Sequence, residues 1–149
     1  MRYVVAPVDE IPPGGRKIVT CGRREIGVFN VDGEFYALRN RCPHQGGPLC
    51  AGALWGSITA SVPGEFRYDE RHDVLTCPWH GWEFDVRTGQ SWCDPAGLRT
   101  RSYPVAVAAG GEVESAAPVE PGKRVKGPYV AETVPVEVVD RFVVVEVRG

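Results

Sequence analysis

Short β-branched and aromatic runs separated by turn residues make up most of this chain. No stretch shows the apolar periodicity of a long amphipathic helix. The pattern is strongest in residues 25–31 and 34–38. Asp32-Gly33 lies between these two runs, and an Asp-Gly pair in that position is typical of a tight β-hairpin. We therefore expect a hairpin that leads directly into Cys42 and acts as a rigid stem for the loop that follows.

Other apolar runs are bounded by Pro, Gly and charged residues, which mark turns. Residues 53–62 and 65–69 are expected to form two strands that flank Pro63-Gly64, and the charged residues 69–73 an exposed turn. Residues 134–139 and 142–147 are expected to form a hairpin around Asp140-Arg141 that closes the sheet against the N-terminal strands. The remaining predicted strands are residues 3–8 and 16–21, which flank a turn at 11–15, residues 74–76 and 82–85, which enter and leave a loop, and residues 105–107 and 112–114.

These elements predict an all-β fold, either a barrel or a sandwich. The chain has 149 residues, a length typical of one domain, so we expect a single domain over residues 1–149. Residues 116–128 differ in composition, because they are rich in Pro, Gly and charge. We interpret them as a solvated loop or arm. A docking role for its basic residues Lys123, Arg124 and Lys126 is the alternative.

Charge and hydropathy exclude several classes of protein. The net charge of −2 does not favour binding to nucleic acid or to an anionic membrane surface. No apolar run approaches the roughly 18 residues of a membrane span, and the first residues lack the layout of a signal peptide. The five cysteines, an odd number, fit a reducing compartment better than a disulfide framework. We therefore expect a cytoplasmic protein with no membrane partner.

Two short motifs carry the candidate chemistry. Cys42-Pro43-His44 and Cys77-Pro78-Trp79-His80 each pair a thiolate with an imidazole, in surroundings rich in Pro and Gly. Two thiolates and two imidazoles can hold one zinc ion or an iron–sulfur cluster. Cys42 and His44 are one residue apart, which is tighter than the usual spacing of about two to four residues between zinc-finger ligands. The spacing therefore favours the cluster, and zinc remains the alternative.

The paired motifs resemble those of Rieske proteins, through Cys42-Pro43-His44-Gln45-Gly46 and Cys77-Pro78-Trp79-His80-Gly81-Trp82-Glu83-Phe84-Asp85. The resemblance implies one 2Fe-2S cluster, antiparallel sheets with two cluster-binding loops at one tip, and a cluster-binding subdomain at about residues 40–95. In the Rieske arrangement two Cys hold one iron and two His the other. The implied ligands are Cys42, His44, Cys77 and His80. The residues expected to surround the ligands are Gly46, Pro78, Trp79, Gly81 and Trp82, of which Trp79 and Trp82 would shield the cluster from water.

The sequence departs from the family at several positions. Thirty-two residues separate His44 from Cys77, about twice the usual gap, which we interpret as a longer hairpin within residues 53–75. High-potential members carry a disulfide between the two loops, and Trp79 stands where its second cysteine would be. They also place hydroxyl donors where this chain has Trp82 and Phe84. The resemblance therefore implies a reduction potential at the low end of the Rieske range. Cys50 and Cys93 are interpreted as free thiols in packing sites.

Three functions compatible with these residues remain open. The first is a ferredoxin that carries one electron at a time from a flavin reductase to a terminal oxygenase. The second is a permanently bound small Rieske subunit of a larger enzyme, similar to the small subunit of assimilatory nitrite reductases. The chain is not expected to be an enzyme itself, because a non-haem iron site needs two further histidines and only His72 is left. A zinc-holding binding module is the third possibility.

Overall fold

A computed structural model describes the backbone of residues 1–92, 98–109, 117–118, 129–130, 137–138 and 141–148. Side chains are described for these residues except 57–61, 66–72, 117–118, 129–130 and 137–138. Three predictions lie outside this part of the chain: the strand at 112–114, the packing of Cys93, and the basic residues of the arm at 116–128. Within the described residues, no helix is long and apolar enough to cross a membrane.

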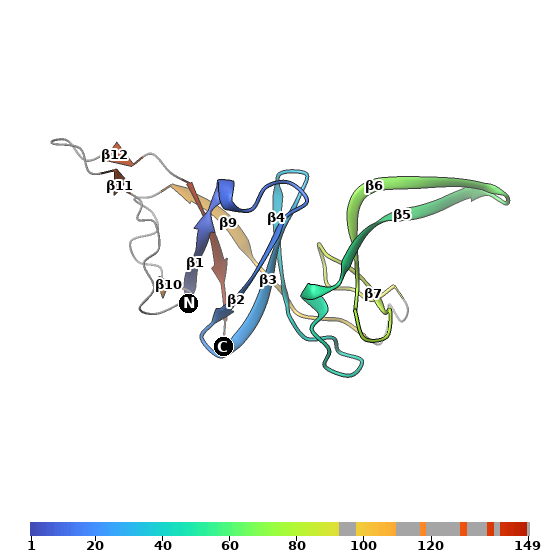
Figure 1. The fold of residues 1–149 in the computed structure, drawn as a ribbon, viewed down its shortest axis with the longest axis horizontal. Coiled ribbons are helices and arrows are strands. Elements are labelled where there is room, and N and C mark those ends of the chain that lie inside the picture. Colours follow the sequence, from blue (N-terminus) through green and yellow to red (C-terminus); the bar gives the residue numbers. More distant parts are fainter. Residues whose placement is uncertain (93–97, 110–116, 119–128, 131–136, 139–140, 149) are drawn as a thin grey trace.

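The predicted central hairpin is confirmed. Strand β3 (Arg24–Val31) pairs with β4 (Glu34–Arg39) around Asp32 and Gly33, whose φ angles of 52° and 89° are those of a tight primed turn. Strand β2 (Arg16–Cys21) and the short β8 (Ser102–Tyr103) extend this antiparallel sheet in the order β2-β3-β4-β8. In Figure 1 these strands form the centre of the molecule.

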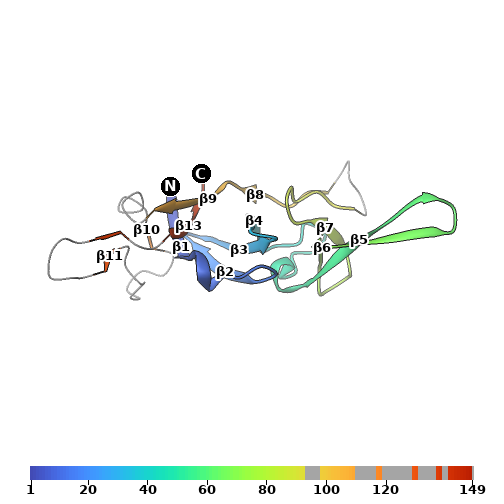
Figure 2. The ribbon, with the colours of Figure 1, turned by 90° about the horizontal axis from the view of Figure 1, so that it is seen from above.

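A second sheet brings the two ends of the chain together in the order β10-β1-β13-β9. Strand β13 (Arg141–Glu146) lies between β1 (Arg2–Pro7) and β9 (Val105–Ala109), so the predicted closure against the N-terminal strand is confirmed. The predicted hairpin of residues 134–139 with 142–147 is wrong, since both edges of β13 are occupied by β1 and β9. Figures 1 and 2 show the two termini side by side. The short elements are β10 (Ala117–Pro118), β11 (Tyr129–Val130), β12 (Glu137–Val138), which pairs with β11, and the 3-10 turn η1 (Val8–Glu10).

A third sheet, in the order β5-β6-β7, contains the long inserted hairpin. Strands β5 (Ala53–Val62) and β6 (Glu65–Thr76) project from the body, as Figures 1 and 2 show, and β7 (Glu83–Asp85) pairs with the end of β6. The 3-10 turn η2 (Leu49–Ala51) leads into β5. The long hairpin is therefore confirmed, including its turn at residues 63–64.

The predicted turn at residues 69–73 is wrong, because β6 runs through it as one strand. The register moves from Trp55 opposite Val74 to Ser57 opposite Asp69, so three additional residues of β6 are absorbed as a bulge. The charge pattern suited a turn, but Asp73 is buried and its carboxylate lies 3.1 Å from the guanidinium of Arg87. Pairing with a cation permits a buried carboxylate inside the strand.

Two apolar clusters hold the sheets together. The larger one joins the first two sheets and includes Ile11, Val28 and Val143, which are all fully buried. The second one lies between the central hairpin and the third sheet, and contains Phe29, Leu75 and Phe84. Cys42 and Cys77 belong to this second cluster, so the core itself fixes where the two sulfur-bearing loops begin.

Candidate metal centre

The first loop, residues 42–47, is a compact turn closed by its own backbone. The N–H of Cys42 donates to the carbonyl of Gly47 at 2.8 Å, and the N–H of Gly46 donates to the carbonyl of Cys42 at 2.7 Å. Gly46 has a φ of 80°, in the left-handed region that favours glycine. These two backbone hydrogen bonds close the loop on itself without using its side chains.

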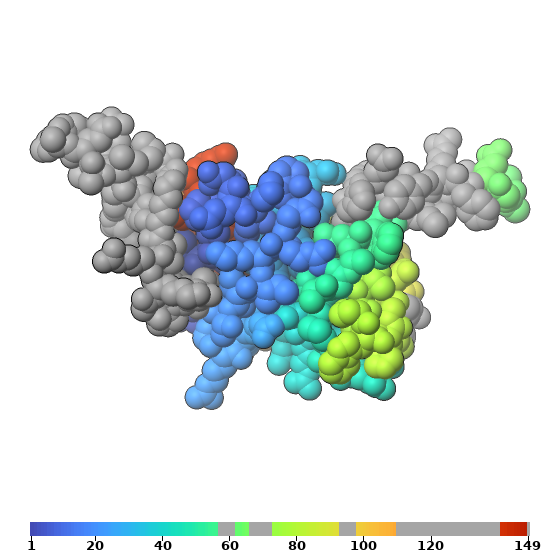
Figure 3. Space-filling model, in the orientation of Figure 1, coloured from blue at the N-terminus to red at the C-terminus, as the bar shows by residue number. Residues whose placement is uncertain are grey.

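The second loop, residues 77–82, folds in the same way. The N–H of Cys77 donates to the carbonyl of Trp82 at 2.8 Å, and the N–H of Gly81 donates to the carbonyl of Cys77 at 3.0 Å. Gly81 has a φ of 73°, and like Gly46 it stands four residues after its cysteine. The two loops therefore share one geometry. Each begins with its cysteine, and the histidine follows two residues later in the first loop and three residues later in the second. In Figure 3 the first-loop region (teal) and the second-loop region (yellow-green) adjoin on one side of the molecule.

Hydrogen bonds fix the chain just beyond the first loop. The side-chain oxygen of Asn40 accepts from the N–H of Cys50 at 2.7 Å. The guanidinium of Arg16, on β2, donates to the carbonyl of Cys50 at 2.9 Å and to that of Gly52. Cys50 is a free, buried thiol packed against Gly27, as predicted. The first loop is thereby tied both to the central sheet and to the start of β5.

The two sulfur atoms are buried and close to each other. Cys42 and Cys77 are each 2% exposed and both are free thiols. Burial raises the pKa of the Cys42 thiol, the backbone N–H of His44 lowers it, and the neighbouring Cys77 thiol raises it again, so that the pKa is above its ordinary value. Since a thiolate is the form that binds metal, a metal bound here must displace that proton.

The two imidazoles also form a pair. The ring centroids of His44 and His80 are 4.9 Å apart, and the rings are nearly perpendicular, at 87°. The Nδ1 atom of His44 is buried without a hydrogen-bond partner, which is costly for a polar atom unless a ligand completes it. His80 is exposed. One imidazole therefore has an orphaned, buried nitrogen, and the other lies at the molecular surface.

The donor set divides into two thiols and two imidazoles. Among the side chains that the structure describes, no three His, Cys, Asp or Glu residues converge on a single metal-sized point. Two thiols that neighbour each other and two imidazoles that neighbour each other match the division in which two Cys hold one iron and two His the second. The orphaned Nδ1 of His44 and the buried thiols therefore fit a two-iron, two-sulfide group.

The two predicted shielding tryptophans differ. Trp82 is half-buried and stacks on His44, with ring centroids 4.5 Å apart and an interplanar angle of 20°. Trp79 is 57% exposed and covers Gly47, where an added Cβ would lie 2.8 Å from the indole. Pro78 is exposed beside it. Trp82 can therefore keep water from the first imidazole, while Trp79 leaves a large apolar surface open at the loop tip.

Sequence reasoning missed a group of arginines at the first loop. Arg39, Arg41, Arg99 and Arg101 line one groove together with residues 42–46. The available signal is an Arg-x-Arg tripeptide that occurs twice, at residues 39–41 and 99–101. Nothing in the local pattern of either tripeptide reveals that the two lie side by side.

Comparisons with known proteins agree with the donor set. The family described as the Rieske [2Fe-2S] domain matches residues 1–104. The ferredoxin subunit of the 3-phenylpropionate/cinnamic acid dioxygenase of Photorhabdus laumondii subsp. laumondii is 33% identical over 106 residues, which are 71% of this chain and 86% of that protein.

Solved structures give the same similarity. The ferredoxin of carbazole 1,9a-dioxygenase from Nocardioides aromaticivorans IC177 matches with a TM-score of 0.57 and 27% identity, over 72% of this chain and 90% of that one. A second similar structure is a complex of reduced oxygenase and oxidised ferredoxin in carbazole 1,9a-dioxygenase. It has a TM-score of 0.54 and 25% identity, over 70% of this chain and 92% of that one.

Proposed function

Because this chain belongs to the Rieske [2Fe-2S] family, we propose that it is a ferredoxin that passes single electrons from a flavin reductase to a terminal oxygenase. The observation that carries this proposal is the pairing of two buried thiols with two imidazoles, one of which has an orphaned Nδ1 while the other is exposed. Similar proteins are named as ferredoxin components of dioxygenase systems, and one similar structure is a complex of ferredoxin with oxygenase.

Cys42 and Cys77 are proposed to hold one iron, and His44 and His80 the other. The bound cluster supplies one-electron chemistry, at a site that is neutral when oxidised and carries one negative charge when reduced. The chain contributes the rest. Burial of the thiols keeps water from the sulfur side, Trp82 covers one face of His44, and the exposed ring of His80 gives a partner a short path to the iron.

The similar proteins are named as ferredoxins or ferredoxin subunits, which carry electrons and do not oxidise the substrate themselves. Of the three histidines, only His72 is left outside the proposed ligand set, and its side chain is not described. The chain is accordingly an electron-transfer component and the oxidation of substrate belongs to its partner. Both the single domain over residues 1–149 and the cluster-binding subdomain at about 40–95 stay predictions.

A fixed small subunit is the second candidate, and the long β5–β6 hairpin favours it, since an arm that projects from the body can serve as an interface (Figure 2). Size-exclusion chromatography of the native protein from its own cells separates the two functions. A free carrier elutes near 16.3 kDa, whereas a fixed subunit elutes with a larger partner through repeated purification steps. Co-elution that survives high salt would overturn the carrier.

The cytoplasm is the proposed location. Apart from the proposed ligands Cys42 and Cys77, the described cysteines are Cys21 and Cys50, and both are free thiols. Burial raises the pKa of Cys21 to about 11 and that of Cys50 to about 12, so both thiols stay protonated and unreactive near neutral pH. Free structural thiols are typical of a reducing compartment.

Replacing Phe84 with tyrosine is expected to raise the reduction potential. Phe84 is fully buried in the same apolar cluster as Cys42 and Cys77, at the position where high-potential relatives of the family have a hydroxyl donor. A hydroxyl that donates to sulfur stabilises the reduced, negative state more than the neutral one. Each kcal/mol of that difference raises a one-electron potential by about 40 mV. The measurement is a redox titration followed by optical absorption.

The control for Phe84→Tyr is Phe142→Tyr, which adds the same hydroxyl to a buried phenylalanine in the terminal sheet. It is expected to leave the potential unchanged. A Phe84→Tyr protein with full iron content and an unshifted potential would contradict the explanation of the low potential by missing hydroxyl donors.

A further inference from the structure

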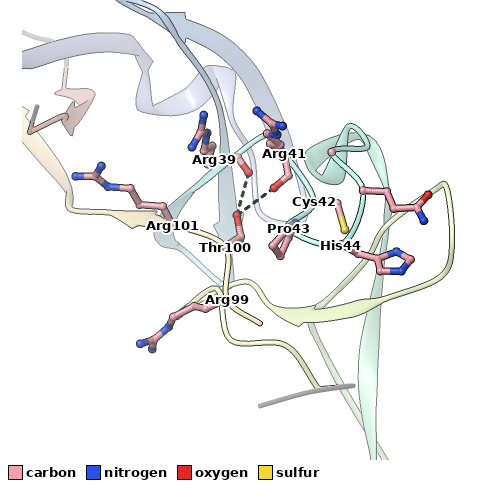
Figure 4. Close-up of a pocket in the computed structure, with 10 residues that line it drawn as sticks. Arg39, Arg41, Cys42, Pro43, His44, Arg99, Thr100 and Arg101 are labelled. Carbon is pink, nitrogen blue, oxygen red and sulfur yellow. Dashed lines mark hydrogen bonds between the residues drawn. The ribbon is translucent and has the colours of Figure 1, made fainter. Parts of the chain in front are cut away.

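The two Arg-x-Arg tripeptides lie side by side although about sixty residues separate them in the chain. The N–H of Arg39 donates to the carbonyl of Arg101 at 2.9 Å. The hydroxyl of Thr100 bonds the carbonyls of Arg39 and Arg41, at 3.4 Å each, and Figure 4 shows both bonds. The end of β4 and the segment that enters β8 are thus joined by backbone contacts, which fixes the positions of the arginines.

All four arginines are exposed, and the residue between each pair is engaged within the protein. Thr100 is buried at 3% exposure, and the side-chain oxygen of Asn40 accepts from the N–H of Cys50. Arg39, Arg41, Arg99 and Arg101 are therefore left at the surface beside the first loop.

These arginines and the first loop line one groove. Of the ten residues that line it, four are arginines, none is a carboxylate, and five are the consecutive residues 42–46 (Figure 4). None of the four guanidiniums forms an ion pair with a carboxylate among the side chains that the structure describes. The guanidinium of Arg101 donates to the carbonyl of Arg148 at 3.2 Å and lies 5.4 Å from the ring centroid of Tyr103. Within the part of the chain that the structure describes, therefore, no carboxylate neutralises the positive charge of the groove.

We propose that this arginine groove, residues 39–46 and 99–101, is the docking surface for a cluster of carboxylates on the redox partner protein. The proposal rests on the proposed electron-carrier function. The chain as a whole is acidic, with a net charge of −2, so four arginines at one site, without a carboxylate partner among the described side chains, are a strong local contrast. A partner seated in the groove contacts the loop that contains Cys42 and His44, which is where an electron must cross.

Physical reasoning favours an acidic protein over other anions. Complementary charge accelerates association and fixes the orientation of a short-lived complex, which suits a carrier that must bind and leave at each turnover. Arginine forks suit carboxylates, because they donate two parallel hydrogen bonds to them. Nucleic acid also carries anions, but the net charge of −2 does not favour binding to nucleic acid.

Electron transfer to small acceptors of opposite charge tests this proposal without the partner. Reduced holoprotein is mixed in a stopped-flow instrument with ferricyanide or with hexaammineruthenium(III), and one electron passes from the protein to each metal complex. The variant is Arg99→Glu, which is distant in sequence from the proposed ligands. The control is Arg141→Glu, which makes the same charge change at an exposed position of β13 outside the groove. A peptide of ten glutamates represents the acidic partner.

At low ionic strength Arg99→Glu is expected to slow oxidation by ferricyanide about three- to tenfold and to accelerate oxidation by hexaammineruthenium(III). Arg141→Glu is expected to change either rate less than twofold. Both effects fade near 1 M salt, where charges are screened within about 3 Å. The glutamate peptide is expected to slow the ferricyanide reaction of the wild type and to leave that of Arg99→Glu unchanged.

The docking groove would be overturned if the ratio of the ferricyanide rate to the hexaammineruthenium(III) rate were equal in wild type and Arg99→Glu. It would also be overturned if Arg141→Glu changed these rates as much as Arg99→Glu does. Saturable binding of a DNA duplex at physiological salt, in preference to the peptide, would assign the groove to nucleic acid instead. Failure of the carrier function has a different signature. A protein that takes up no electron reacts with neither acceptor, whereas a misplaced docking surface leaves both reactions running.

Discussion

Replacing Cys77 with serine is expected to leave the chain folded but without its iron–sulfur centre. In the proposed arrangement each iron has two protein ligands, so the loss of one thiolate would leave its iron with a single protein ligand. A serine hydroxyl does not ionise near neutral pH and is a poor substitute for a thiolate. Changes to groups that merely support ligands cost about ten- to a hundredfold in metal affinity, so removal of a ligand is expected to cost at least tenfold in affinity and to leave the purified protein with little iron. Cys42→Ser is expected to behave in the same way.

The measurement is the iron and acid-labile sulfide content per chain after anaerobic purification. Cys21→Ala is the matched control, because Cys21 is another buried free cysteine that lies in the apolar cluster of the first two sheets. It is expected to cost stability but to keep its iron. Full iron and sulfide in both Cys42→Ser and Cys77→Ser would show that the cluster is held elsewhere.

Replacing Gly52 with alanine is expected to have the largest effect on stability. A Cβ at Gly52 would lie 1.8 Å from the carbonyl oxygen of Thr76, which is a backbone atom and cannot turn away. Thr76 directly precedes Cys77, and Gly52 also accepts the hydrogen bond from Arg16. The backbone must therefore shift where Gly52, which follows the first loop, packs against Thr76, which precedes the second loop. Overpacking of this kind costs about 3 kcal/mol, which lowers the Tm by roughly 6–12 °C in a chain of this length.

Thermal unfolding followed by circular dichroism measures this effect. Gly64→Ala serves as control, because an added Cβ there meets nothing within 4 Å. Its φ of 89° still costs about 1 kcal/mol with a side chain present, so the control isolates conformational strain from the clash. Equal Tm values for the two variants would contradict the close contact between η2 and the end of β6.

Local signals in the sequence predicted those parts of the fold that depend on neighbouring residues. Asp32-Gly33 determines its own turn, so the β3–β4 hairpin could be predicted, and Pro63-Gly64 likewise marks the tip of β5–β6. The strand partners of β13 could not, because the pairing with β1 joins residues at opposite ends of the chain. The sequence predicted a local hairpin for β13, but β1 and β9, which are distant in sequence, occupy both edges of β13.

The charged residues 69–73 show a second limit. Their composition is that of a turn, but the partner that neutralises Asp73 is Arg87, from a later part of the chain. Composition alone does not reveal such a pair, so the strand that passes through the bulge was missed.

The candidate site follows the same rule. Cys42, His44, Cys77 and His80 were visible because each motif is local and the two motifs are alike. The stacking of Trp82 on His44 and the arginine groove arise only when distant segments meet in space. The repeated Arg-x-Arg pattern can be read from the sequence, but it forms a groove only because residues 39–41 pair with residues 99–101 in the fold.

The most direct test of a one-electron carrier is electron paramagnetic resonance of the anaerobically purified protein, recorded as the potential is lowered in steps. We expect a Rieske-type signal that appears with one-electron dependence toward the low end of the range from roughly −150 to +300 mV. Protein that contains zinc in place of iron and sulfide, and that gives no signal at any potential, would contradict the account.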